Sequence, residues 1–160
     1  MALDMFIKIG DIKGESADSK HKEKIDVLSW SWGLSNSGSA QIGGGAGSGK
    51  VNVLDLTFTK YVDSSTPPLL LAGSNGKHYP EANLIVRKAG ENPVEYIKLK
   101  MTDVIITSVS TGGSGGEDRL TETVTLNFAK VALDYTPQSK DGKGATAIPY
   151  NWDIAGNIKG

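Results

Sequence analysis

The chain has 160 residues, of which 38% are hydrophobic and 20 are glycines, so it has the usual length of one domain and enough apolar material for a single core. Its 17 basic and 18 acidic residues leave a net charge of −1, which gives no overall positive field to gather nucleic acid or anionic lipid. The absence of cysteine excludes a disulfide framework, a thiolate zinc site and a cysteine nucleophile.

The first stretch, MALDMFIKIGDIKG, does not have the organisation of a secretory signal peptide. Asp4 and Lys8 lie within its apolar part, and no basic region precedes a long apolar run. No stretch of the sequence reaches the roughly 18 apolar residues that a membrane helix needs. We therefore expect a protein made in the cytoplasm, whose export would use a route that does not depend on a signal peptide.

Alternation of apolar and polar residues predicts strands through most of the chain. The expected strands cover 3–9, 25–34, 51–60, 82–88, 94–101, 104–110 and 119–135. In the second of these, one face carries Leu28, Trp30, Trp32 and Leu34 and is expected to pack on the core. The other face carries Ser29 and Ser31 and is expected to meet solvent or a partner.

The longest predicted strand, 119–135, changes its apolar face along its length. Val124, Leu126 and Phe128 occupy even positions, whereas Val131 and Leu133 occupy odd ones. A bulge or sharp bend produces such a change. Bent strands of this kind close a sheet into a barrel or carry it between two packed sheets.

One short helix is predicted after the third strand. Hydroxyl residues at 64–66 offer N-caps, prolines at 67–68 fit a first helical turn, and apolar residues at 69–72 precede Gly73 and Gly76. Many strands and one helix indicate a mainly β protein. We expect a single domain over 1–160, folded as a compact antiparallel β-barrel of two packed sheets with one short α-helix.

Two segments are too polar and glycine-rich to pack a core, namely 35–50 (SNSGSAQIGGGAGSGK) and 110–118 (STGGSGGED). The first is long enough to predict a functional or disordered loop that projects from the barrel. Its end, 44–50, has the glycine and lysine spacing of a phosphate-binding loop. Val51 stands where such loops need Ser or Thr, and a strand pattern follows instead of a helix, so we expect no nucleotide site.

Metal and catalytic sites are weakly signalled. His21 lies in a charged stretch and His78 in a turn, and neither has a second histidine at metal-binding spacing, so both are expected to be solvated or turn residues. Glu117 and Asp118 resemble a solvated loop end, and a hydrolase would need a further carboxylate across a cleft. Trp152, near Pro149, Tyr150 and Ile154, belongs to a last strand that packs on its own domain or on a neighbour.

Several segments together resemble the haemolysin-coregulated protein (Hcp) family, the tube-forming subunits of bacterial type VI secretion. They are MFIKIGDIKGES near the start, IDVLSWSWG at 25–33, FTKYVDSSTPPLL at 58–70, GKHYPEA at 76–82 and STGGSGGEDRLTETVTLNF at 110–128. The resemblance covers essentially the whole chain.

The resemblance implies a compact β-barrel with one helix that assembles as a six-membered ring around a wide channel. Such rings stack into the inner tube that a contractile sheath drives out of the cell, and they hold small effector proteins inside the ring. It also implies a non-enzymatic protein, released without a signal peptide, with no cofactor, no metal and no catalytic residue. The implied partners are further copies of the chain and the sheath, tip and effector proteins.

The ring gives the strand and loop patterns specific roles. We expect Ser29 and Ser31 to face the channel and set what cargo fits. We expect the loop at 35–50 to mediate ring stacking, and its candidate contact residues are Gln41, Ile42, Gly43, Gly44, Gly45 and Lys50.

Two rival functions remain open from the sequence. One is a secreted hydrolase that uses carboxylates such as Asp103, Glu117 or Asp118. The other is a monomeric β-sandwich that binds carbohydrate through Trp152 or Tyr150.

Overall fold

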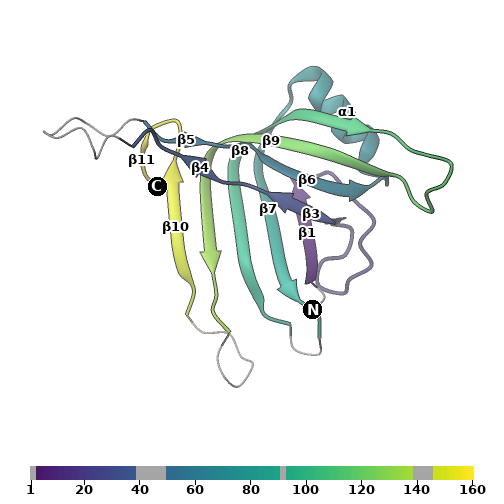
Figure 1. The fold of residues 1–160 in the computed structure, drawn as a ribbon, viewed down its shortest axis with the longest axis horizontal. Helices are drawn as coiled ribbons and strands as arrows, with labels where there is room; N and C mark the ends of the chain where they lie inside the picture. Colours follow the sequence, from purple (N-terminus) through teal and green to yellow (C-terminus); the bar gives the residue numbers. More distant parts are fainter. Residues whose placement is uncertain (1–2, 39–49, 91–92, 139–145) are drawn as a thin grey trace, which may run out of the picture.

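The structure, a computed structural model, describes residues 3–38, 50–90, 93–138 and 146–160. Within these ranges the chain forms eleven strands and one helix (Figure 1). In chain order they are β1 (Leu3–Ile9), β2 (Ile25–Asp26), β3 (Ser29–Ser31), β4 (Leu34–Ser35), β5 (Asn52–Val53), β6 (Leu56–Tyr61), α1 (Thr66–Asn75), β7 (His78–Lys88), β8 (Glu95–Thr111), β9 (Thr121–Tyr135), β10 (Ile148–Asp153) and β11 (Ile158–Lys159).

Most strands form where alternation predicts them. The strand predicted over 3–9 coincides with β1, and those predicted over 94–101 and 104–110 are the two halves of β8. The strand predicted over 25–34 is wrong in its continuity, because it is divided among β2, β3 and β4. The reason is that this segment changes its pairing partner twice, from β1 to β6 and then to β5.

A nine-stranded antiparallel sheet wraps around the core (Figure 1). Its order is β11-β10-β9-β8-β7-β1-β2, and β9 also pairs with β6, which pairs with β3. Between β2 and β3 the chain crosses from one side of the wrapped sheet to the other. There Val27 N–H donates to the Met5 carbonyl at 2.9 Å, and Leu28 N–H donates to the Thr59 carbonyl at 2.8 Å. In the described residues the ladder is interrupted at this crossing, so the predicted barrel is not closed by strand pairing.

The long strands β8 and β9 bend together. Phe128 and Val131 of β9 are both buried although they are three residues apart, and Met101 and Val104 of β8 show the same odd spacing. Asp103, between the two β8 residues, has a φ of 56°, in the left-handed region. An odd spacing of buried residues means that the buried face changes. The change of face predicted for the long strand, and the bend that it requires, are therefore confirmed.

The bend divides β9 between two neighbours. Before it, residues 121–126 pair with β6, and after it, residues 130–135 pair with β10. On its other side β9 pairs with β8 throughout, with one irregularity between Ile106 and Ser108. The two long strands thus belong to both halves of the wrapped sheet, which confirms the predicted mainly β architecture.

The core lies between the two halves of the wrapped sheet and the helix. Buried side chains with 0–1% exposure come from β1, β6, β7, β8 and β9, for example Ile7, Phe58, Leu84, Leu99 and Val124. These residues are large and apolar, and their removal from water is the main driving force for this arrangement.

The predicted helix is confirmed, and it is longer than its apolar stripe. The prolines at 67–68 occupy its first turn, and it ends at Gly76, whose φ of 69° is a left-handed cap that favours glycine. Leu69 and Ala72 are buried against the sheet, whereas Leu71 is 63% exposed. Only one side of the predicted apolar stripe therefore joins the core.

A buried ion pair fastens the start of α1 to the sheet. Lys60 of β6 and Glu122 of β9 are fully buried side chains, with 2.5 Å between Nζ and Oε2. The hydroxyl of Thr66 donates to the same carboxylate oxygen at 2.9 Å, and the Lys60 ammonium also lies 3.2 Å from Asp63 Oδ1. Each charge therefore has a partner in a region from which water is excluded.

We predict that Lys60→Met strongly destabilises the fold, because it leaves the Glu122 carboxylate buried without its cation. Breaking a buried pair in this way costs about 3–5 kcal/mol, whereas an exposed pair contributes less than about 1 kcal/mol. The matched control is Lys13→Met, since the Lys13–Glu23 pair has side chains that are 75% and 57% exposed. Urea unfolding measures both variants, and equal stabilities for the two would contradict this account of the ion pair.

Candidate functional site

Ser29 and Ser31 lie on the exposed face of β3, as the alternation predicts. The register places them opposite Thr59 and Thr57 of β6, and the Ser29 and Thr59 hydroxyl oxygens are 2.6 Å apart. These threonines were not among the residues predicted from the sequence. Their signal was available, because they alternate with buried residues such as Phe58 in the strand predicted over 51–60.

The opposite face of this segment joins the core only in its middle. Trp30 and Trp32 are partly buried and pack against the core, as expected. Leu28 and Leu34, expected to be buried beside them, are 38% and 49% exposed, so the prediction is wrong at both ends. Leu28 lies at the crossing between ladders, and Leu34 lies in β4, which pairs with β5 in a separate two-stranded sheet.

The ring-stacking candidates cannot be placed in the same way. Residues 41–45, which comprise Gln41, Ile42, Gly43, Gly44 and Gly45, lie outside the described residues. Lys50 is described and exposed. The role expected for this loop stays a prediction.

The carboxylates of the hydrolase rival occupy exposed positions. Asp103 lies at the bend of β8, where its Oδ1 is 3.0 Å from Nδ1 of His78. Glu117 and Asp118 lie in the exposed connection between β8 and β9. Throughout the described ranges there is no group of three or more His, Cys, Asp or Glu side chains that could hold a metal ion.

The aromatic residues of the carbohydrate rival face their own domain. Trp152 belongs to β10 and packs against the core, and its indole Nε1 is buried. Tyr150 lies near Trp32, with ring centroids 6.2 Å apart and planes tilted by 43°. The strand predicted around Trp152 is β10, and it packs on its own sheet, where it pairs with β9.

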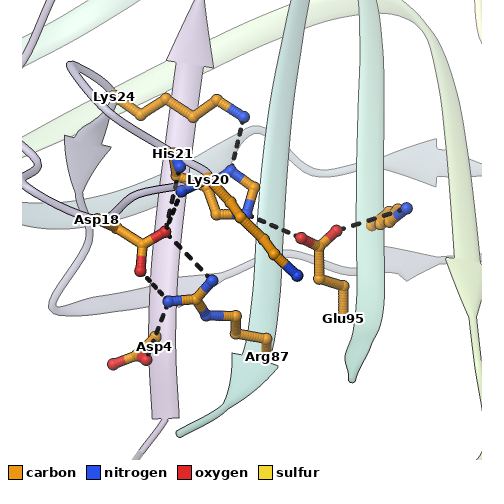
Figure 2. Close-up of polar contacts among 8 residues, drawn as sticks. Asp4, Asp18, Lys20, His21, Lys24, Arg87 and Glu95 are labelled. Carbon is orange, nitrogen blue, oxygen red and sulfur yellow. Dashed lines mark hydrogen bonds and ion pairs between the residues drawn. The ribbon is translucent and has the colours of Figure 1, made fainter. Parts of the chain in front are cut away.

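Figure 2 shows a dense polar cluster that fastens the loop between β1 and β2 to the sheet. His21 was expected to be a solvated or turn residue. It begins a turn, in which Lys24 N–H donates to its carbonyl at 3.2 Å, but its side chain is not solvated, because the residue is 4% exposed and its ring stacks on Phe6 at 4.7 Å. Lys24 Nζ donates to its Nδ1 at 2.8 Å, and its Nε2 lies 2.8 Å from Glu95 Oε1. A protonated lysine can only donate, so Nδ1 accepts and Nε2 carries the proton that it donates to Glu95.

The second half of the polar cluster joins Arg87 of β7 to two aspartates. Its guanidinium forms an ion pair with Asp18 and lies 3.5 Å from Asp4 Oδ2 (Figure 2). The hydrogen bond from Arg87 lowers the pKa of Asp18. Burial acts to raise the pKa of Glu95, but the hydrogen bond from His21 and the charge and hydrogen bond of Lys98 lower it below its usual value. Both carboxylates are therefore held in their charged form, as in a structural clamp.

No helix in the described part of the chain has the length and hydrophobicity to cross a membrane.

Comparisons with known proteins agree with the fold and extend over the whole chain. A family model described as "Type VI secretion system effector, Hcp" matches residues 6–135. The protein Hcp1 of Pseudomonas aeruginosa is 63% identical over 161 residues, which covers 99% of both chains. Among solved structures, "Structure of a type six secretion system protein" has a TM-score of 0.93 at 31% identity and covers 99% of this chain and 100% of the other. Hcp1 from Salmonella typhimurium has a TM-score of 0.81 at 38% identity, with 99% of each chain covered.

Proposed function

The chain belongs to the Hcp family and is a secreted subunit of the type VI secretion tube that assembles as a hexameric ring, and we propose that the exposed face of β3 lines the channel of that ring. The observation that carries the function is the similarity to Hcp proteins over the whole chain. Within the ring, Ser29 and Ser31 would contact cargo, since their side of the sheet is turned away from the core.

We also propose that the role is structural, without catalysis. The carboxylates of the hydrolase rival support this, because Asp103 and its partner His78 are exposed side chains and the other two carboxylates lie in an exposed connection. The carbohydrate rival is disfavoured by the packing of Trp152 against its own core.

The proposed partners follow from the tube. They are further rings of the same chain, the sheath around the tube, the proteins at its tip and effector proteins in the channel. The family, whose model is described as a type VI secretion system effector, supports release through the secretion system itself.

We predict that Ser31→Gln leaves ring assembly intact and reduces effector retention. The longer side chain enters the channel from each of six subunits without touching the core, and we expect retention to fall about tenfold, equivalent to about 1.4 kcal/mol. Light scattering measures the ring, and co-purification measures the effector. Ser74→Gln, on the exposed end of α1, is the control. Rings of the Ser31 variant that retain effector as well as the parent would refute the channel assignment.

We further propose that the glycine-rich segment 35–50 joins one ring to the next. A long polar segment between two strand patterns is suited to contacts beyond its own domain. Its one large apolar residue, Ile42, is the expected contact.

Removal of residues 43–49 is predicted to leave rings intact and abolish tubes, as seen by electron microscopy of negatively stained protein. The control removes Gly115 and Gly116 from the exposed β8–β9 connection, where a side chain at either position would meet nothing within 4 Å. Unaltered tubes and secretion in the first deletion would show that this segment has no part in stacking.

A further inference from the structure

The outer face of four neighbouring strands carries an unbroken set of hydroxyl residues, which we call the hydroxyl field. The strands are β3, β6, β9 and β8, and each contributes two residues. The field consists of Ser29, Ser31, Thr57, Thr59, Thr123, Thr125, Ser108 and Ser110.

The strand register arranges the field in two rows. One row runs through Ser31, Thr57, Thr125 and Ser108, and the other through Ser29, Thr59, Thr123 and Ser110. Residues paired across antiparallel strands point to the same side of the sheet, so each row presents four hydroxyls together. Neighbours within the rows approach each other, at 2.6 Å for one pair of hydroxyl oxygens and 3.3 Å for another.

The field points away from the core. The residues that alternate with it on β6 and β9, such as Phe58 and Val124, are fully buried on the other side of the sheet. The four serines of the field are exposed and its four threonines are partly exposed. The hydroxyls that are not satisfied within a row are therefore available to a partner.

The field carries no formal charge, although 35 of the 160 residues of the chain are charged. Two charged side chains on or beside the same strands make contacts within the chain. Asp55 Oδ1 accepts a hydrogen bond from the Asn127 amide at 2.8 Å, and the Arg119 guanidinium lies over the Tyr61 ring at 3.6 Å. Hydroxyls both donate and accept, so such a surface fits uncharged polar groups in either orientation.

We propose that the hydroxyl field is the cargo-contacting wall of the ring channel, and that it takes the uncharged polar surface of a folded effector protein, with backbone, amide and hydroxyl groups as the recognised chemistry. This rests on the proposed placement of Ser29 and Ser31 in the channel. It extends that site from one strand to four. It also predicts that cargo is held by hydrogen bonds between uncharged groups, whose strength depends little on salt. Binding of a charged partner such as nucleic acid would weaken strongly as salt is added.

The channel potential is measured first, with defined reagents. Because the chain has no cysteine, Ser31→Cys and Ser110→Cys each create a single thiol. In assembled rings we compare the labelling rates with a cationic and an anionic methanethiosulfonate. For a neutral wall, the ratio of the cationic to the anionic labelling rate should lie within about twofold of the ratio that the same two reagents give with the free thiol 2-mercaptoethanol. A channel potential of one kT would change this ratio about sevenfold, because it speeds one reagent and slows the other. A larger bias of either sign would overturn the neutral wall.

A maleimide attached to a polyethylene glycol too large to enter the channel tests the channel placement independently of the neutral wall. It should fail to label Ser31→Cys in rings and label Ser74→Cys on α1. If it labels both equally, the channel placement itself is wrong, whatever the ratio of the small reagents.

Cargo recognition is measured with the effector that parental rings retain when purified from the secreting bacterium. Retention should change less than about twofold between about 0.1 and 1 M NaCl, although the screening length falls from about 10 to 3 Å. Thr59→Val removes one hydroxyl from each subunit at constant shape and should weaken retention about threefold to tenfold, whereas Thr59→Ser retains it. Ser110→Ala, at an exposed position, is the second test variant, and Thr102→Val, on β8 outside the field, is the control.

Retention that is lost in high salt would show a charged interface and overturn the inference. So would full retention by both Thr59→Val and Ser110→Ala rings. Parental rings that retain no protein would contradict cargo carriage as well as the hydroxyl field's part in it.

Discussion

The shared bend of β8 and β9 is the constraint on which the rest of the structure depends. At Asp103 the backbone enters the left-handed region, and the buried face of both strands changes there. One half of β9 can therefore pair with β6 and the other half with β10 while both halves cover one core. The same geometry leaves the hydroxyl residues of the first half together on the outer face. The core and the proposed channel wall are thus formed by opposite faces of the same strands.

Two polar clusters hold the remaining parts against this bent sheet. The buried Lys60–Glu122 pair fixes the start of α1. The cluster around His21 and Arg87 fixes the loop between β1 and β2 over β7 and β8. Both use charges that are paired in places of low water access, where an unpaired charge is costly. In each cluster the charged groups pair with one another, although Arg87 Nε and Glu122 Oε1 are buried without a hydrogen-bond partner among the described residues. Such pairing suits clusters that fasten one segment of the chain to another.

The sequence predicted what local patterns determine. The strand 3–9, the helix whose first turn contains the prolines at 67–68 and the change of face in 119–135 all follow from spacing and turn chemistry within one segment. The predictions were wrong where contacts with residues distant in the sequence determine whether a side chain is buried. His21 is buried because Glu95, 74 positions away, accepts its hydrogen bond, and Leu28 is exposed because its segment crosses between two ladders. The hydroxyl field was missed for the same reason, since only the register of four strands brings its residues together.

The most direct test of this account is an electron cryo-microscopy structure of the assembled protein. The account predicts a closed six-membered ring in which β3, β6, β9 and the adjoining part of β8 form the inner wall, with the hydroxyl field turned toward the channel. A ring with this face on its outer surface, or buried between subunits, would contradict the account. So would a protein that remains a stable monomer at micromolar concentration.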